Sequence, residues 1–400
     1  MRKVKFHSQA LNQEFEVGRI IGEYHGEEEG PVLVFFGGVH GNEPAGVVAL
    51  MRAMEMLDKL KPAIRGSIYA ICGNMSAMEK GERFNSMDLN RIWTRDRIKR
   101  IEEGYLNEED DNLDCKEQRE LFQIGKDIFA KYEHQVYCID IHTTSADSIP
   151  FIAINDTLIN RSFSAHFPVP VVLGIEEFLT GPLLNWIMEI GYPCLAFEAG
   201  SHHTVESIEN AEAFVCLSLV YAGLIKAADL PDHKKYLAHL EGTNFDQERV
   251  FEVRYKREVS PEDNFKMNPG YVNFQPIQKD EALAVDKSGD LKAPENGRIF
   301  MPLYQSQGGD GYFGIREIAP FWLSLSGWLR EAGFESILTL LPGVNRDPKE
   351  HFTLIVNKQV AKFLAVEIFH LLGYRNKEKT EKELRFSRRE YDVRGIAKYQ

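Results

Sequence analysis

The stretch Pro31-Val-Leu-Val-Phe-Phe-Gly-Gly-Val-His40-Gly-Asn-Glu43-Pro44 joins an apolar run to a glycine-rich turn and then to a proline. The run is short and rich in β-branched and aromatic residues, which predicts a buried strand. Two glycines let the backbone turn sharply, and Pro44 precedes a helical pattern, as proline often does at a first helical position. We therefore expect His40 and Glu43 on a loop at the carboxyl end of a strand, where open α/β sheets bind their ligands.

His40 and Glu43 are residue types that bind metal ions. An imidazole and a carboxylate three residues apart, with a third ligand from elsewhere, suit a catalytic zinc site that keeps one position open for water. A single His-x-x-Glu is a weak signal, because a histidine and a glutamate in a turn are more often capping or solvated residues. A metal site therefore requires further ligands from the remaining strands.

The composition is that of an ordinary globular protein of 400 residues, long enough for two domains or for one domain with a large appendage. The net charge of −13 disfavours nucleic-acid and anionic-membrane partners, because phosphate binding needs a basic face. The five cysteines are odd in number and widely spaced, and four lie in apolar runs, which predicts reduced core thiols. We expect a cytoplasmic protein, since the first residues lack a secretory pattern and the apolar stretch 352–374 is broken by charges.

Two later strands also end in polar side chains. The run Gln135–Ser145 is apolar until Asp140 and His142, which are two residues apart and so project to the same face of a strand. The run 192–198 ends in Glu198, just before Gly200. A second carboxylate near a two-histidine, one-carboxylate set is able to take a proton from water.

The order of the patterns predicts three regions. Strands and helices alternate through residues 1–240, which we interpret as an α/β catalytic domain. Short alternating strands and frequent turns predict a small all-β domain at residues 241–320. Residues 321–400 are predicted to form a helical extension that ends in a polar tail. An apolar helix around Val360, Phe363, Leu364, Ile368 and Leu371 is expected to pack on its own domain, although a homo-oligomer remains open.

Four motifs in this order resemble the succinylglutamate desuccinylase/aspartoacylase family. They are Gly-Gly-x-His40-Gly-Asn-Glu43, Asp88-Leu-Asn90-Arg91, Asp140-x-His142-Thr-Thr-Ser145 and Phe197-Glu198-Ala-Gly200. The resemblance covers residues 30–230 with strong motifs and 250–320 more loosely. It implies an α/β fold with a zinc-carboxypeptidase-like mixed sheet flanked by helices, followed by a smaller β domain.

The resemblance also implies roles for individual residues. His40, Glu43 and His142 would bind one Zn²⁺ per chain. Glu198 would be the general base that activates water, and Arg83 would polarise the scissile carbonyl and stabilise the oxyanion. The implied activity is that of a zinc-dependent amidohydrolase that cleaves the amide bond of a small N-acyl amino acid.

Further residues would hold the substrate and orient the ligands. Asn90 and Arg91 would bind the α-carboxylate of the substrate, because a guanidinium pairs with a carboxylate at two points. Asp140 would accept a hydrogen bond from a ligating imidazole and fix its tautomer. Tyr312 is the expected counterpart of a tyrosine that closes such sites from the β domain.

Simpler interpretations exist for each residue and for the whole chain. Glu198 would serve equally as a helix-capping acid, Arg91 as a partner of Asp88, and Asp140 with His142 as a buried pair. A carboxypeptidase-like metallopeptidase acting on short peptides is the alternative enzyme. A protein that binds a metal or ligand without catalysis is a third interpretation. The joint occurrence of the motifs at strand ends favours the hydrolase, and neither the acyl group nor the amino acid can be named from the sequence.

Overall fold

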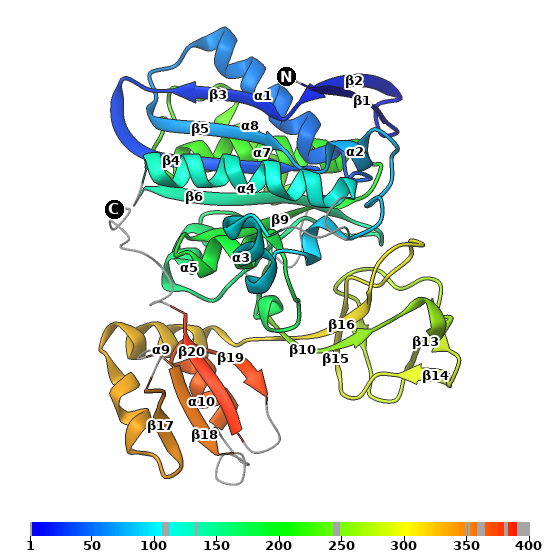
Figure 1. The fold of residues 1–400 in the computed structure, drawn as a ribbon, viewed down its shortest axis with the longest axis vertical. Helices are drawn as coiled ribbons and strands as arrows, with labels where there is room; N and C mark the ends of the chain where they lie inside the picture. Colours follow the sequence, from blue (N-terminus) through cyan, green and yellow to red (C-terminus); the bar gives the residue numbers. More distant parts are fainter. Residues whose placement is uncertain are drawn as a thin grey trace.

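The predicted strand at residues 31–36 lies inside a large mixed sheet of the computed structural model. The structure describes residues 2–105, 112–132, 135–242, 249–348, 350, 353–357, 365–379 and 383–389. Within them the sheet has 11 strands (Figure 1), in the order β12 (Pro276–Ile277), β15 (Gly297–Phe300), β16 (Asp310–Glu317), β10 (Val250–Glu258), β8 (Val171–Leu173), β7 (Phe151–Ile154), β9 (Cys194–Ser201), β6 (Val136–Thr144), β4 (Glu28–Gly37), β5 (Arg65–Cys72) and β3 (Ile20–His25).

The central strands place their carboxyl ends at one edge of the sheet. β4 runs parallel to β5 and β6, and β6 runs parallel to β9. The register sets Gly37 beside Ile141 and His142 beside Glu198. The loop that follows β4 therefore lies next to the ends of β6 and β9, as the sequence predicts.

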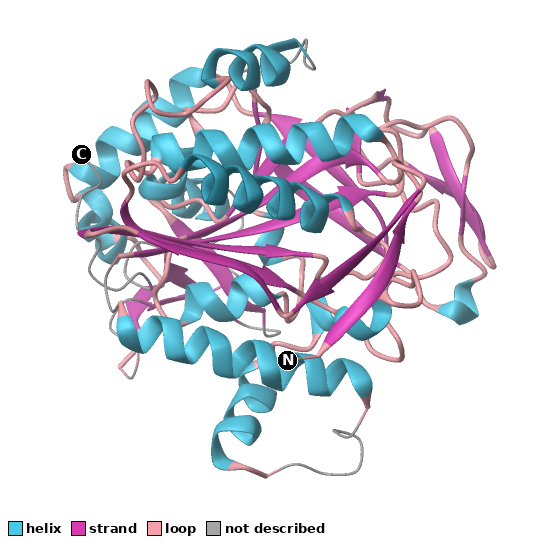
Figure 2. Cartoon of the chain, turned by 90° about the horizontal axis from the view of Figure 1, so that it is seen from above, coloured by secondary structure: helices cyan, strands magenta, loops and turns pink. Residues whose placement is uncertain are grey.

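Helices cover both faces of this sheet (Figure 2). Alternate residues of β4 face opposite sides, so Phe35 joins one buried cluster while Val34 and Phe36 join another. The first cluster includes residues of α1 (Ala45–Leu60), α7 (Val205–Tyr221) and α8 (His233–Gly242). The second includes residues of α4 (Leu113–Lys131) and α6 (Leu183–Glu189).

Shorter elements complete the first part of the chain. They are β1 (Lys3–Ser8), β2 (Gln13–Gly18), α2 (Met75–Met78), η1 (Leu89–Arg91), α3 (Arg95–Glu103), α5 (Leu158–Ser164) and η3 (Ile175–Glu177). The five cysteines are buried and free, as predicted. Among the described residues, every helix is too short or too polar to cross a lipid bilayer.

The smaller β domain is confirmed, and it continues the large sheet. β10 pairs in parallel with β8 and antiparallel with β16, so the polypeptide enters the domain as a strand of the main sheet. A separate three-stranded sheet, β11 (Lys266–Met267), β13 (Ala282–Asp286) and β14 (Gly289–Lys292), lies at its outer end (Figure 1). The short helix η4 (Pro261–Asp263) follows β10. The domain boundaries at residues 240 and 320 stay a prediction.

The prediction of a helical extension after residue 320 is wrong. α9 (Pro320–Glu331) and η5 (Phe334–Leu340) are followed by a four-stranded antiparallel sheet in the order β17 (Val344–Arg346), β18 (Thr353–Asn357), β20 (Glu383–Arg388) and β19 (Tyr374–Lys379). In β18 and β20, alternate residues such as Leu354 and Phe386 are buried in one cluster. This period of two, in runs of only five or six residues, was masked by the apolar helical pattern beside it.

The structure describes only the last part of that predicted apolar helix, α10 (Ala365–Leu371). Ile368 packs against the same cluster as β18 and β20, and Phe369 stacks on Phe386 with 4.3 Å between ring centroids. The helix therefore packs on its own module. Val360, Phe363, Leu364 and the predicted polar tail after Arg389 lie outside the described residues.

Candidate active site

The loop after β4 is shaped by glycines that have no substitute there. Gly38 has φ +70°, a left-handed conformation that side chains other than glycine rarely adopt. A Cβ on Gly41 would lie 2.3 Å from backbone atoms of Ala77 and Met78. This tight path turns His40 back over the strand ends and delivers Glu43 to the start of α1.

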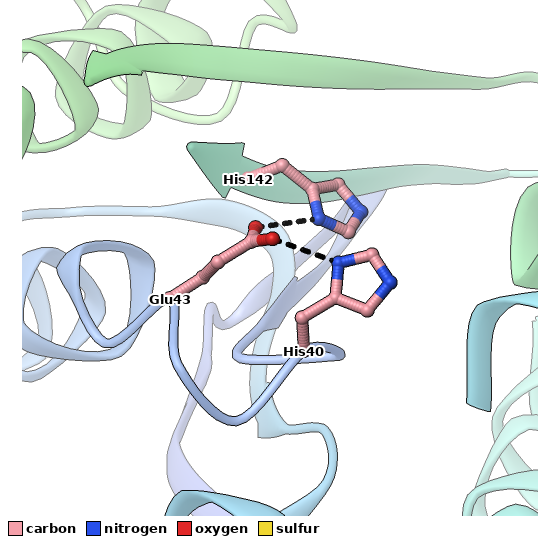
Figure 3. A group of neighbouring side chains, drawn as sticks. All are labelled: His40, Glu43 and His142. Atoms are coloured by element: carbon pink, nitrogen blue, oxygen red, sulfur yellow. Dashed lines mark hydrogen bonds and ion pairs between the residues drawn. The ribbon is translucent and has the colours of Figure 1, made fainter. Parts of the chain in front are cut away.

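His40, Glu43 and His142 meet in one cluster (Figure 3). Glu43 Oε1 lies 2.9 Å from His40 Nδ1, and Glu43 Oε2 lies 3.0 Å from His142 Nδ1. One ligand atom from each of the three lies within 4.8 Å of the others, and all three side chains are buried. Two nitrogen donors and a carboxylate that converge in this way form a suitable partial shell for a metal ion.

Each histidine of the cluster carries a second carboxylate on its other nitrogen. His142 Nε2 lies 2.7 Å from Asp140 Oδ2, and His40 Nε2 lies 3.1 Å from Asp88 Oδ1. A carboxylate on the far nitrogen fixes the tautomer and raises the basicity of a ligating imidazole. The structure thus places Asp140 where the resemblance implied. It also places Asp88, for which the sequence indicated only a pairing with Arg91, in the same role behind His40.

Carboxylates surround the two imidazoles of the cluster: Glu43 contacts both, Asp88 contacts His40 and Asp140 contacts His142. Burial lowers the pKa of His142, but Asp140 and Glu43 outweigh it and hold that pKa well above its usual value. Burial raises the pKa of Glu43, and the two histidines pull it well below the usual range, so Glu43 is ionised. The backbone N–H of Thr143 also donates to Glu43 Oε2 at 3.0 Å. The carboxylates thus stabilise positive charge at the imidazoles, and a metal ion bound there would take the place of that proton, which supports a metal site.

Glu198 faces the cluster from the neighbouring strand, beside His142 in the register. Its side chain lines the cavity, only 7% of the residue is exposed, and its Oε2 has no hydrogen-bond partner among the described residues. Burial, with the nearby charges of Glu43 and Asp140 and against that of His142, raises the pKa of Glu198 to about 8. A buried carboxylate with a free oxygen and a raised pKa is suited to proton transfer.

The three polar residues from the 83–91 segment also line the cavity, each with protein partners. Arg83 Nη1 donates to Glu43 Oε1 at 3.3 Å, and Arg83 Nε donates to Asp88 Oδ2 at 3.3 Å. Asn90 Oδ1 accepts a hydrogen bond of 2.9 Å from the backbone N–H of Leu183. Arg91 Nη2 lies 2.6 Å from Asp310 Oδ2, so a residue of the β domain already holds this guanidinium.

The structure does not bring Tyr312 to the cavity. Tyr312 is buried in the core of the small β domain, with Met267 and Leu283, and Asp310 and Phe313 of the same strand line the cavity instead. The register of β16 shifts at this point, with Tyr312 opposite Arg257 and Asp310 opposite Glu258. This extra residue reverses the alternation of side chains, which the sequence pattern does not reveal.

The fold and this cluster define a mixed α/β protein with a buried two-histidine, one-carboxylate group at the carboxyl edge of its sheet. Residues 29–207 match the family model of the succinylglutamate desuccinylase/aspartoacylase catalytic domain. The resemblance predicted from the sequence is confirmed for this part of the chain.

Individual proteins show the same similarity. The chain is similar to succinylglutamate desuccinylase of Pseudomonas paraeruginosa, with 33% identity over 118 residues, 29% of this chain and 32% of that protein. The counterpart from Pseudomonas fluorescens is 29% identical over 118 residues, with the same shares of 29% and 32%. The matched part spans about a third of the length of these curated relatives.

Solved structures share the fold over a larger part of the chain. A succinylglutamate desuccinylase from Vibrio parahaemolyticus has a TM-score of 0.53 and 14% identity, covering 80% of this chain and 91% of that one. A succinylglutamate desuccinylase/aspartoacylase from Rhodobacter sphaeroides has a TM-score of 0.54 and 15% identity, covering 80% and 95%. At this identity the likeness establishes the fold alone.

Proposed function

We propose that this chain is a zinc-dependent deacylase that hydrolyses the amide bond of a small N-acyl amino acid. The observation that carries the proposal is the convergence of His40 Nδ1, Glu43 and His142 Nδ1 beside Glu198, which has an unpartnered buried oxygen. The similarity of residues 29–207 to a family with named desuccinylases points to the same chemistry.

The donor set suits Zn²⁺ better than Mg²⁺ or Ca²⁺, which prefer oxygen ligands. His40, Glu43 and His142 would hold the ion, with Asp88 and Asp140 behind the two imidazoles. A zinc ion in such a site supplies a Lewis acid and lowers the pKa of water toward neutrality.

Glu198 is placed to transfer the protons of the hydrolysis. As a carboxylate it takes a proton from the attacking water, whose oxygen forms a bond to the carbonyl carbon. The same proton then passes to the nitrogen of the leaving amine as the C–N bond breaks, so Glu198 returns to its initial state. The guanidinium of Arg83, which also lines the cavity, stabilises the negative charge that develops on the carbonyl oxygen.

Asn90 and Arg91 are proposed to bind the α-carboxylate of the substrate. Arg91 is held by Asp310, so the substrate carboxylate has to share or displace that ion pair. Residues 301–303 and 308–310 of the β domain line the same cavity, and we propose that they narrow its entrance. A narrowed entrance favours a small substrate over the peptide chain that a carboxypeptidase-like enzyme would admit.

The proposal is tested by amine release from a panel of N-acyl amino acids and short peptides, before and after chelation of the metal. We expect chelator-sensitive hydrolysis of N-acyl amino acids and little hydrolysis of peptides. Glu198→Gln should lose most turnover, on the order of 100-fold or more, whereas the exposed Glu209→Gln on α7 is the matched control. Peptide hydrolysis without amino acid deacylation would instead establish the metallopeptidase.

A further inference from the structure

The cavity extends beyond the cluster along the face of the sheet. His142, Glu198 and Phe151 lie side by side in one row across the neighbouring strands β6, β9 and β7. Two residues before Glu198 on β9, Ala196 lies in a second row between Asp140 on β6 and Ala153 on β7. Alanine side chains fill little space, so the sheet surface is hollowed at this second row. Ala153 and Ala196 both line the cavity, and we call this inner part the side channel.

The walls of the side channel are apolar. α6 contributes Leu184 and Met188, and the segment around η3 contributes Ile175 and Leu179. The cationic residues that line the cavity are those already described near the cluster: His40, Arg83, Arg91 and His142. Arg375 lies behind this wall, with Nη1 3.1 Å from Met188 Sδ, so among the described residues that line the inner part none is cationic.

The inner end of the channel lies well away from the cluster. Cys194 precedes Glu198 by four residues on β9, which corresponds to about 13 Å along a strand. Asn155 follows Ile154, the partner of Leu195, so it lies at the same end. Glu176 lines the same cavity as Cys194, and burial together with the charge of Glu176 raises the pKa of the Cys194 thiol.

Glu176 closes the channel with an acceptor atom. Its side chain is 6% exposed, its Oε1 accepts from Arg389 Nε at 3.2 Å, and its Oε2 has no hydrogen-bond partner among the described residues. Asn155 Oδ1 is likewise buried without a partner there. Arg389 comes from the carboxyl-terminal part of the chain, outside the residues 29–207 that match the family model.

These contacts make the inner end a poor site for a charged group. A carboxylate at the inner end would meet the oxygens of Glu176 and Asn155 with no lining cation, and burying an unpaired charge is costly. An ammonium group would meet Glu176, whose negative charge Arg389 already balances through Oε1, so the charge of the ammonium group would stay uncompensated. The cavity as a whole, including its polar part beside His40 and Glu43, has a volume of about 150 Å³, so the side channel takes up only part of this space.

The position of the channel indicates which part of the substrate enters it. Asn90 bonds to the backbone N–H of Leu183, the first residue of α6, and α6 forms the channel wall. A substrate whose α-carboxylate is bound by Asn90 and Arg91 therefore has its Cα beside the opening. We infer that the side channel binds the amino acid side chain, and that the substrates are N-acyl derivatives of uncharged, mainly apolar amino acids such as methionine, leucine and phenylalanine. This inference rests on the deacylase function proposed above.

The test compares kcat/KM of the zinc-loaded enzyme for substrates that share one acyl group. We expect N-acetylmethionine, N-acetylleucine or N-acetylphenylalanine to exceed N-acetylaspartate, N-acetylglutamate and N-acetyllysine by on the order of 100-fold. Equal or better hydrolysis of the charged substrates would overturn the inference while leaving the deacylase in place. Preference for N-hexanoylglycine over N-acetylmethionine would assign the channel to the acyl group and would also overturn it. Hydrolysis of none of these compounds would refute the deacylase function itself.

Two channel variants separate a specificity role from a general loss of fold. Ala196→Leu fills the channel, so the ratio of kcat/KM for N-acetylmethionine to that for N-acetylglycine should fall by roughly 10- to 100-fold. Met188→Ala widens the side channel and should raise the ratio of kcat/KM for N-acetyltryptophan to that for N-acetylmethionine. Ala165→Leu, at an exposed position after α5, is the matched control. Unchanged ratios in both channel variants would contradict the inference. A second readout without turnover is the binding of free amino acids to Glu198→Gln, in which methionine should bind more tightly than aspartate.

Discussion

Asp140→Asn should weaken zinc binding without changing the ligands. Asp140 is fully buried, and its Oδ2 lies 2.7 Å from His142 Nε2. Asparagine keeps the shape of the side chain but removes the negative charge that holds the imidazole with Nδ1 toward Glu43. Loss of such a carboxylate typically costs 10- to 100-fold in metal affinity, which corresponds to about 1.4 to 2.7 kcal/mol.

The affinity is measured by competition with a chromophoric chelator of known zinc affinity at fixed pH. Asp88→Asn should show a smaller loss, because its contact with His40 is longer, at 3.1 Å, and Asp88 is less buried than Asp140. Asp127→Asn, on the exposed side of α4, controls for the change in net charge. Zinc affinity of Asp140→Asn equal to that of the control would refute the assignment of His142 as a ligand through Nδ1.

Two other predictions concern ion pairs away from the metal ligands. Asp156 is buried among Arg161, Arg330 and Arg389, and although burial raises the pKa of Asp156, the three guanidinium groups lower it overall. Asp156→Asn should lower the free energy of unfolding by about 3 kcal/mol in denaturant titrations. Because the pKa of Asp156 is depressed in the folded state, its contribution to stability is fully present above the unfolded-state pKa of about 4 and is lost as the pH falls below that value. An unchanged denaturation midpoint would contradict this. Asp310→Asn frees Arg91 from its carboxylate partner and should lower KM by roughly two- to five-fold with kcat nearly unchanged; a raised KM would show instead that Asp310 orients Arg91 for the substrate.

The part of the site that lies at the ends of strands was predictable from the sequence. The apolar run 31–36, the spacing of Asp140 and His142, and the acid at the end of 192–198 each indicate a strand that delivers polar groups to the carboxyl edge. The parallel register then brings these edges together, because β4, β6 and β9 are neighbours. His40, Glu43, His142 and Glu198 meet for that reason, although their catalytic roles stay predictions.

The parts that failed depend on geometry that no local pattern records. The register of β16 shifts by one residue, so Tyr312 points into the core of the small β domain and Asp310 lines the cavity. The contact between Asp88 and His40 joins loops 48 residues apart. The four-stranded sheet after residue 343 consists of short strands beside a strongly apolar helix, so the helical period dominated the sequence pattern.

The most direct measurement is the zinc content per chain, determined by atomic absorption on the wild type, Glu198→Gln and His142→Ala, together with amine release from N-acetylmethionine. We predict one zinc per chain in the wild type and in Glu198→Gln, with turnover only in the wild type. His142→Ala should lose both the metal and the activity. Full turnover in metal-free wild type, or undiminished zinc in His142→Ala, would contradict the site described here.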